Sequence, residues 1–227
     1  MADLGTVVSR VTRITTAWIQ DVNNFIYRSI GSSGGSALVG FISAGAGAVL
    51  RTLQSKLRES VSVLDFGADP TGATDSTAAF QAALDLAGTV SAIRRVFVPS
   101  GAYLLSRIYV PAGVVLEGEA ITETTARTGT KFIQGADGDV IRFIPQNTGG
   151  KNYWFGAIRR LAIFGDTSFA SGWGISFRDS ADATVSMQDL SCLEDLIIRR
   201  CPSGGIEIPN SGLPITLQRI KLLFNNG

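Results

Sequence analysis

The pattern of hydrophobic and polar positions divides the chain into three segments. In the first, between residues 9 and 30, apolar residues recur in steps of three and four, at Val11, Ile14, Trp18, Val22 and Phe25. This spacing predicts an amphipathic helix, and an isolated helix of this length needs a partner for its apolar face. The partner is either its own domain, other copies of the helix or another protein. The flexible "GSSGGS" that follows favours an intermolecular role.

The second segment, residues 37–59, contains the short helical pattern "AVLRTLQSKLRES". Gly45 and Gly47 raise the question of a phosphate loop, but the sequence has neither G-x-x-x-x-G-K-[ST] nor G-x-G-x-x-G. We therefore interpret residues 37–59 as a neck that joins an N-terminal segment, residues 1–36, to a third segment, residues 60–227.

The third segment consists of short β-rich runs, separated by Gly, Pro, Asn and Asp. One pattern repeats along it: Ile158-x-x-Leu161-x-Ile163, Leu193-x-x-Leu196-x-Ile198 and Leu217-x-x-Ile220-x-Leu222. A second pattern interleaves with it: Gly174-Ile175-x-Phe177 and Gly205-Ile206-x-Ile208. The repeats predict a mainly β chain whose strands form a right-handed parallel β-helix. A β-sandwich stays open as an alternative, because alternation alone does not separate the two folds.

Stacking the repeats in register places Arg160, Asp195 and Arg219 in one column. Neighbouring strands lie about 4.8 Å apart, so the column is a plus–minus–plus charge ladder. Exposed pairs of this kind contribute only about a few tenths of a kcal/mol each. A polysaccharide-binding role for the column is the alternative.

The composition excludes several function classes. The chain has no histidine, which removes Ser–His and Cys–His pairs and His-ligated zinc. Its formal net charge is +1 without a basic block, so we expect no nucleic-acid partner. Cys192 and Cys201 would lie roughly 25–30 Å apart on an extended run, which predicts free thiols and synthesis in a reducing compartment. The longest apolar stretch is short and glycine-broken, so no membrane insertion is expected.

Candidate catalytic and metal-binding residues are few. Glu117 and Glu119 alternate onto one strand face and form a weak catalytic candidate pair, about 6–7 Å apart, although Gly118 indicates a strand end. The adjacent Glu194 and Asp195 point to opposite faces, which favours ladder and turn roles.

Two further groups have both a functional and a structural interpretation. Asp137 and Asp139 lack the calcium-loop pattern and indicate a turn. Tyr153, Trp154 and Trp173 suit either sugar stacking or packing in a core or subunit interface. The sequence thus predicts no metal and no cofactor.

The stretch "SVSVLDFGADPTGATDSTAAFQAALDLAG", residues 60–88, predicts a strand, a turn and a helix in succession. Asp65 lies in the alternating run of residues 63–66, which we expect to be a strand. The segment Asp69-Pro70-Thr71-Gly72 is typical of a turn. Asp75 is placed to N-cap a helix over residues 76–87 that ends at Gly88. Its apolar face is suited to covering the open end of a β-helix, through Phe80, Ala83, Leu84 and Ala87.

Within this stretch, "SVLDFGADPTGATDSTAAFQAAL" resembles the opening motif of the pectate-lyase-like β-helix superfamily, as found in phage tailspikes and tail-fibre depolymerases. The preceding residues are similar to the neck of those tail proteins, and "AWIQDVNN" resembles short podovirus-type anchors. The resemblance covers residues 1–100, and the later strands more generically.

The resemblance implies a homotrimer in the virion tail, made in the cytoplasm of the bacterial host. Its N-terminus would bind a phage tail or adaptor protein, and its distal β-helix would bind host surface polysaccharide. The chain stops directly after a strand without a visible solenoid cap, so we expect the N-terminal portion of a longer polypeptide, with any catalytic centre outside residues 1–227. The alternatives are a polysaccharide depolymerase whose active site lies partly in these residues and, more weakly, a free secreted pectate-lyase-like enzyme.

Overall fold

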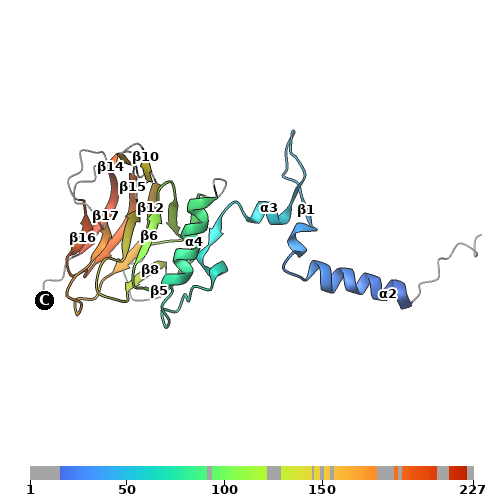
Figure 1. The fold of residues 1–227 in the computed structure, drawn as a ribbon, viewed down its shortest axis with the longest axis horizontal. Coiled ribbons are helices and arrows are strands. Elements are labelled where there is room, and N and C mark those ends of the chain that lie inside the picture. The colour runs from blue at the N-terminus through green and yellow to red at the C-terminus, as the bar shows by residue number, and fades with distance from the viewer. Residues whose placement is uncertain are drawn as a thin grey trace, which may run out of the picture. The chain divides into compact units, whose positions relative to one another are not determined.

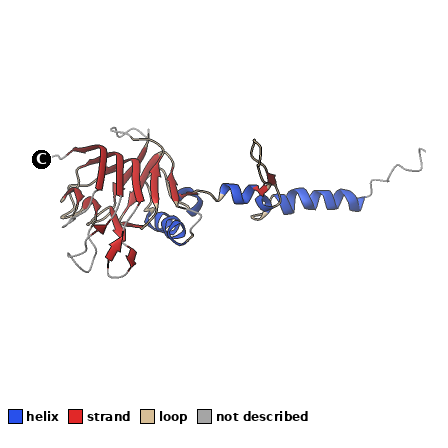
Figure 2. Ribbon diagram, turned by 90° about the horizontal axis from the view of Figure 1, so that it is seen from above, coloured by secondary structure: helices blue, strands red, loops and turns tan. Residues whose placement is uncertain are grey.

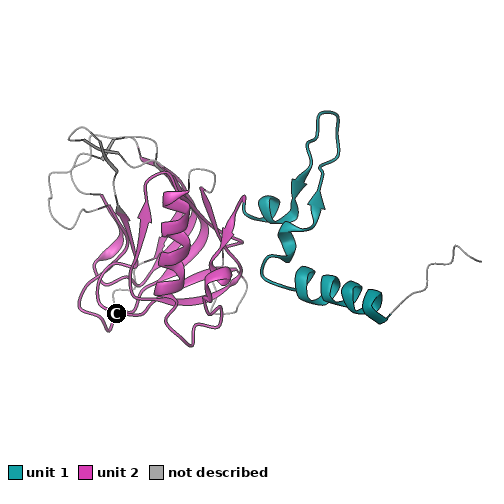
Figure 3. Cartoon of the chain, turned by 45° about the vertical axis from the view of Figure 1, so that its right-hand side comes forward, with its two compact units in different colours: residues 1–58 teal, residues 59–227 magenta. Residues whose placement is uncertain are grey.

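The computed structural model describes residues 16–90, 94–121, 129–144, 146–148, 151–153, 156–177, 187–188, 191–208 and 215–223. The chain divides into two compact units, residues 1–58 and residues 59–227 (Figure 3). Among the described helices, none is long and apolar enough to span a bilayer.

The first unit is built from short helices and one hairpin. Its elements are α2 (Thr16–Asn23), the π-helical η1 (Asn24–Ile30), the 3₁₀-helix η2 (Gly35–Ala37), β1 (Gly40–Phe41), β2 (Arg51–Thr52) and α3 (Leu53–Leu57). The two strands pair antiparallel. The Thr52 side chain caps α3 by accepting a hydrogen bond from the Ser55 backbone N–H at 3.0 Å.

The predicted N-terminal helix is described from residue 16 onward. Trp18 and Phe25 are each 55% exposed, Val22 is partly buried, and no residue of α2 or η1 is buried. Val11 and Ile14 lie outside the described residues. The amphipathic face and its binding role therefore stay predictions.

The second unit is mainly β. Its elements are β3 (Val61–Ser62), η3 (Val63–Phe66), α4 (Thr77–Thr89), β4 (Arg95–Val98), β5 (Gly101–Leu105), β6 (Ile108–Pro111), β7 (Val115–Gly118), β8 (Thr130–Gln134), β9 (Ile141–Ile144), β10 (Gln146–Thr148), β11 (Lys151–Tyr153), β12 (Gly156–Phe164), β13 (Trp173–Ser176), β14 (Met187–Gln188), β15 (Ser191–Arg199), β16 (Gly204–Glu207) and β17 (Ile215–Leu223). Figure 1 shows α4 at one end of the strands and β16 and β17 at the other.

Most strands belong to two parallel sheets (Figure 2). The larger sheet has the order β17-β15-β12-β7-β4-β3, and β8 joins it by pairing with both β12 and β5. The smaller has the order β16-β13-β9-β6. A short additional sheet contains β10, β11 and β14. Parallel pairing is incompatible with the β-sandwich alternative, whose sheets are antiparallel.

The register of the long strands is the one that the sequence repeat predicts. Ile158 pairs with Leu193, and Leu193 with Leu217. Leu161 likewise pairs with Leu196, the partner of Ile220. Equivalent aliphatic residues therefore stack in columns along neighbouring strands.

A left-handed residue lies in the middle of each long strand and explains the three-residue step of the repeat. Arg160, Asp195 and Arg219 have φ of 58°, 52° and 51°. In a regular strand, residues three apart face opposite sides. The left-handed residue shifts the alternation of side chains between the two faces by one position. Ile158 and Leu161 therefore face the same side, and both are fully buried.

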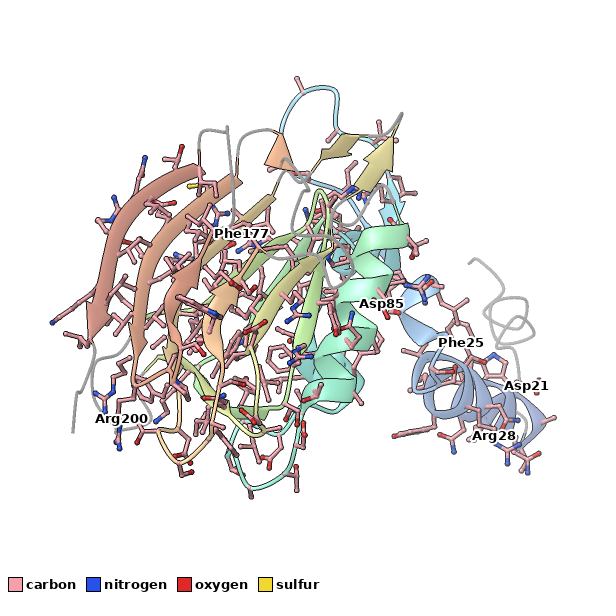
Figure 4. All side chains as sticks on the ribbon, turned by 60° about the vertical axis from the view of Figure 1, so that its left-hand side comes forward. Asp21, Phe25, Arg28, Asp85, Phe177 and Arg200 are labelled. Atoms are coloured by element: carbon pink, nitrogen blue, oxygen red, sulfur yellow. The ribbon has the colours of Figure 1, made fainter. Side chains whose placement is uncertain are left out.

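The core contains two groups of aromatic rings. Phe80 of α4 makes edge-to-face contacts with Tyr103 and Phe132, each at a centroid distance of 5.2 Å. Phe143 and Phe177 stack at 4.4 Å, and Figure 4 shows Phe177 among the side chains of the strands.

The helix α4 buries the face that the sequence predicts, through Phe80, Ala83, Leu84 and Ala87. It contacts η3, β3, β4 and β6, the first elements of the unit. Its predicted ends need correction. Ser76 is the N-cap residue, and the carboxylate of Asp75 instead accepts from the Thr77 backbone N–H at 2.7 Å.

Gly88 is not the stop of this helix, which continues to Thr89. A Cβ at Gly88 would lie 2.9 Å from the Cβ of Pro111. The glycine therefore serves close packing against β6, and it does not adopt a left-handed terminating conformation.

The predicted strand over residues 63–66 is also wrong, because these residues form η3. The Ser62 hydroxyl accepts from the Leu64 backbone N–H at 3.3 Å, and the Asp65 carboxylate accepts from the Ser62 backbone N–H at 3.2 Å. This capping box satisfies the backbone locally and overrides the alternating pattern. Gly67, with φ of 85°, ends the turn.

Candidate functional site

Charged side chains gather on β4, β7, β12, β15 and β17 of the larger sheet. We call them the charge cluster: Arg95, Glu117, Arg159, Arg160, Glu194, Asp195 and Arg219. The parallel register brings them together, since Glu117 pairs with Arg159, and Arg159 with Glu194.

Glu117 is the buried centre of the charge cluster, with only 4% of the residue exposed. Its Oε1 accepts from Arg160 at 2.5 Å. Its Oε2 forms an ion pair with Arg95 at 2.6 Å and accepts a hydrogen bond from Arg159 at 3.2 Å. A buried carboxylate is costly unless cations and hydrogen-bond donors compensate it, and three guanidinium groups do so here.

Arg219 organises the other end of the charge cluster. It donates to Glu194 at 2.5 Å and to Oδ2 of Asp195 at 3.0 Å. The hydrogen bond from Arg219 lowers the pKa of Asp195, and the charge of Arg160 acts in the same direction. In the predicted ladder, Arg219 thus contacts Asp195 directly, whereas the ion pair of Arg160 is with Glu117.

A pocket of about 280 Å³ lies within the charge cluster, lined by Glu117, Arg159, Arg160, Glu194 and Asp195. Each of its carboxylates has an arginine partner. The arrangement is therefore suited to charge pairing.

The two carboxylates of the candidate catalytic pair have separate partners. Glu119 lies beyond the end of β7, and its Oε2 accepts from the Ser100 backbone N–H at 2.8 Å. This hydrogen bond lowers the pKa of Glu119. The carboxylate of Glu117 contacts the arginines of the charge cluster, Arg95, Arg159 and Arg160. A catalytic role for the pair stays a prediction.

Asp69 organises the predicted turn in the opening stretch. Its carboxylate accepts from the backbone N–H groups of Thr71 at 2.8 Å, Ala73 at 3.1 Å and Thr74 at 2.9 Å. The side-chain hydrogen bond from Thr71 is the main cause that lowers the pKa of Asp69. Gly72, which follows Pro70 and Thr71, has φ of 74°, a conformation that favours glycine.

Asp75 connects the start of α4 to the end of β5. Its Oδ2 accepts from the Ser106 hydroxyl at 2.7 Å, and Thr77 accepts from the Ser106 backbone N–H at 2.8 Å. Among the described residues, no cluster of acidic or cysteine side chains is arranged to hold a metal ion.

A larger pocket, of about 710 Å³, lies between the turns that follow β12 and β15. Trp173, Phe169 and Arg200 contribute to its lining, and Arg200 has φ of 60° at the edge of the strands (Figure 4). Burial raises the pKa of the Cys201 thiol in this pocket to about 12. Both Cys192 and Cys201 are free thiols.

The other residues considered from the sequence have structural contacts where they are described. Asp137 accepts from the Ser171 backbone N–H at 2.8 Å. Asp139 pairs with Arg142 at 2.5 Å and accepts from the Trp173 backbone N–H at 3.0 Å. The side chain of Tyr153 and all of Trp154 lie outside the described residues.

The sequence reasoning missed Glu117 as an ion-pair centre. Its partners Arg159 and Arg160 are more than 40 residues away in sequence. The strand register of the repeat could have revealed these ion pairs. Extended from β12 to the preceding strand of the sheet, β7, it places Glu117 beside Arg159.

Residues 60–208 match the family described as "Rhamnogalacturonase A/epimerase, pectate lyase-like". The chain belongs to this family. The resemblance recognised in residues 62–84 is thereby confirmed at the level of the family.

The proteins similar to the chain include phage tail proteins. The chain is 30% identical over 116 residues to the tail spike protein of Shigella phage Sf6. That match covers 47% of this chain and 19% of the phage protein, so the chain spans about a fifth of its curated relative.

The solved structures similar to the chain include two viral proteins. ORF18 of Geobacillus virus E2 has a TM-score of 0.53 and 21% identity, over 74% of this chain and 34% of that one. Tailspike protein 3 of bacteriophage CBA120 has a TM-score of 0.48 and 17% identity, over 92% of this chain and 39% of that one. The similarity to ORF18 shows a common fold.

Proposed function

We propose that the chain is part of a phage tail spike. In this proposal residues 1–36 attach the spike to the virion tail, residues 37–59 form the neck, and residues 60–227 form the first part of a β-helix domain. The similarity to the tail spike protein of Shigella phage Sf6 carries the proposal. Such a protein is synthesised in the cytoplasm of the host bacterium and assembled into the virion.

The parallel sheets support a right-handed parallel β-helix as the architecture of residues 60–227. Aliphatic residues stack in register across β12, β15 and β17. The helix α4 contacts β3, β4 and β6 at one end of the strands and buries Phe80 there. We assign α4 the role of a cap that keeps water from the first turn of the solenoid.

In this proposal three copies assemble into a homotrimer. Exposed apolar side chains on α2 and η1, including Phe25 and Tyr27, support an intermolecular contact with other copies or with a tail protein. The β-helix then presents host-specific surfaces to a polysaccharide of the bacterial surface.

A polysaccharide depolymerase is the second candidate function, favoured by the description of the family. The carboxylates of the charge cluster are paired with arginines, so we propose that these residues stabilise the fold and that any catalytic centre lies elsewhere in the parent protein. The proposal also disfavours a free secreted enzyme, because it assigns residues 1–36 to an anchor.

Deletion of residues 1–36 tests the anchor. The shortened protein is expected to keep its β-rich circular dichroism spectrum and to be lost from purified phage particles. The variants Trp18→Ala and Phe25→Ala should lower incorporation, while the matched control Asp21→Ala should not. Unchanged incorporation of the deletion variant would refute the anchor.

Two measurements on residues 1–227 test the remaining parts. Light scattering after gel filtration is expected to give the mass of a trimer, and a monomer at all concentrations would contradict this. Incubation with purified capsule or O-antigen is expected to leave the polysaccharide intact. Depolymerisation by this chain alone would overturn the placement of catalysis elsewhere and favour the second candidate.

A further inference from the structure

The described residues of the first unit have no apolar core. Between residues 16 and 58 only Gly35 is buried, whereas the buried apolar residues of the described chain begin at Val61. Twelve large apolar side chains in residues 16–58 are 39–74% exposed, and they include Trp18, Phe25, Tyr27, Ile42, Leu50 and Leu57. A unit of this size without a core is not stable alone in water, so these side chains require a partner surface.

The exposed apolar side chains are distributed over the whole unit, whose elements Figure 3 shows. Phe25 lies on the helix formed by α2 and η1, Leu50 lies between β1 and β2, and Leu57 ends α3. An amphipathic helix at a membrane surface has its apolar residues on one face and several Lys and Arg residues on the other. The helix formed by α2 and η1 carries a single basic residue, Arg28. The distribution therefore favours a protein partner that encloses both the helix and the hairpin.

The first unit carries a net positive charge. Residues 1–58 contain six basic and two acidic residues, a formal net charge of +4, and because the whole chain carries +1, residues 59–227 carry −3. Among residues 16–58, Asp21 is the single acidic residue. Arg28 and Arg58 are exposed, and Figure 4 shows Arg28 on the same helix as Phe25. Copies of this unit would repel one another, whereas an acidic surface would attract the unit.

We propose that residues 16–58 bind an acidic, apolar-lined socket in the tail protein that holds the spike. The proposal rests on the proposed function, which assigns the N-terminal residues to virion attachment, and it adds residues 37–58 to the contact and defines the chemistry of the partner. Apolar side chains such as Phe25 and Leu50 bury their surface in the socket and supply affinity. Arg28 and Arg58 meet carboxylates at its rim, which speeds association and selects the partner.

The test measures binding of the fluorescently labelled 227-residue chain to purified particles of the parent phage that lack the spike. The chain is sedimented with the particles, and the bound fraction gives the dissociation constant. At about 0.05 M NaCl, the double variant Arg28→Glu/Arg58→Glu should bind at least about tenfold more weakly, and Asp21→Lys should bind about threefold more tightly. The affinity of the wild type should fall between about 0.05 and 0.5 M NaCl, and that of the double variant should fall much less, because salt screens the attraction.

Charge reversals in the second unit provide the matched control. Arg94→Glu/Lys221→Glu changes the net charge of the chain by the same amount, and both side chains are exposed. This control should change the dissociation constant by less than about twofold, because charges outside the contact are screened. Circular dichroism checks that the second unit of each variant is folded, and Arg28→Gln/Arg58→Gln should have an intermediate effect.

Three results would overturn this inference alone. The first is equal weakening by Arg28→Glu/Arg58→Glu and by the control, or weaker binding of Asp21→Lys. The second is a smaller mass of Phe25→Asp than of the wild type in light scattering, which would assign the apolar side chains to other copies of the chain. The third is tighter binding of the wild type to phosphatidylglycerol vesicles than to the particles, which would assign them to a membrane surface. A wild-type chain that binds neither particles nor vesicles would refute virion attachment itself, and this inference with it.

Discussion

Replacement of the buried carboxylate Glu117 by glutamine tests the electrostatic centre of the second unit. The side chain is 5% exposed and contacts three arginines whose side chains are 38–48% exposed. Removing one partner of a fully buried ion pair costs about 3–5 kcal/mol. Because these arginines keep much of their hydration, we expect Glu117→Gln to lower the free energy of unfolding by about 2–3 kcal/mol.

Denaturant unfolding followed by circular dichroism measures this loss. In a thermal melt it corresponds to a decrease of about 4–12 °C for a unit of this size. The control is Glu119→Gln, the same chemical change at a carboxylate that accepts from the Ser100 backbone N–H. It should cause only a small fraction of the loss.

Salt separates the electrostatic explanation from a packing defect. The loss in Glu117→Gln should shrink between about 0.05 and 0.5 M NaCl, because salt screens both the lost attraction and the remaining repulsion between guanidinium groups. The reasoning is refuted if Glu117→Gln costs less than about 0.5 kcal/mol, matches Glu119→Gln, or shows a loss that is independent of salt.

Three other changes have defined outcomes. Phe80→Ala should cost about 3–5 kcal/mol in denaturant unfolding because it removes a fully buried ring, and Phe66→Ala, at a side chain that is 38% exposed, should cost less than half as much; equal losses would contradict the packing of α4. Gly88→Ala should lower the free energy of unfolding by about 1–3 kcal/mol, because the new methyl group meets Pro111. At an exposed helix position the same substitution would raise the stability by about 1 kcal/mol, so a stabilised variant would show that Gly88 is not tightly packed. The pKa of Asp69 is lowered in the folded state, so its contribution to stability is present above the unfolded pKa of about 3.9 and is lost as the pH falls towards the folded value. Asp69→Asn should therefore destabilise at pH 6, and its difference from the wild type in unfolding midpoint should shrink as the pH falls below about 3.9; a constant difference between pH 6 and pH 2.5 would argue against the carboxylate.

The register of the long strands could be predicted because it depends on the spacing of aliphatic residues along the sequence. The spacing of Ile158, Leu161 and Ile163 recurs around Leu193 and Leu217, and stacking of like residues then fixes the alignment. The buried face of α4 was predictable for the same reason, since its four buried residues follow helical spacing.

Features that depend on local hydrogen bonds or on distant packing were missed. The capping box of Ser62 and Asp65 competes with an alternating pattern that on its own favours a strand. Gly88 has the position of a helix stop, and only the approach of Pro111, more than 20 residues later, reveals its packing role. The ion pairs of Glu117 likewise require the strand order before any sequence signal can be interpreted.

The left-handed residues also decide how the charge cluster should be interpreted. A non-glycine residue in the left-handed conformation lowers the stability of the fold by roughly 1–2 kcal/mol. An exposed ion pair contributes less stabilisation than that. The larger compensation comes from the core, because the change of phase at Arg160 lets both Ile158 and Leu161 become fully buried, and each buried aliphatic side chain contributes about 1.5–3 kcal/mol. The backbone therefore adopts the left-handed corner to bury aliphatic side chains. Arg160, Asp195 and Arg219 occupy that corner on successive strands and alternate in charge because like charges there would repel. On this reasoning the charge cluster stabilises the stacking of strands, and a ligand that binds it would have to compete with ion pairs that the fold already satisfies.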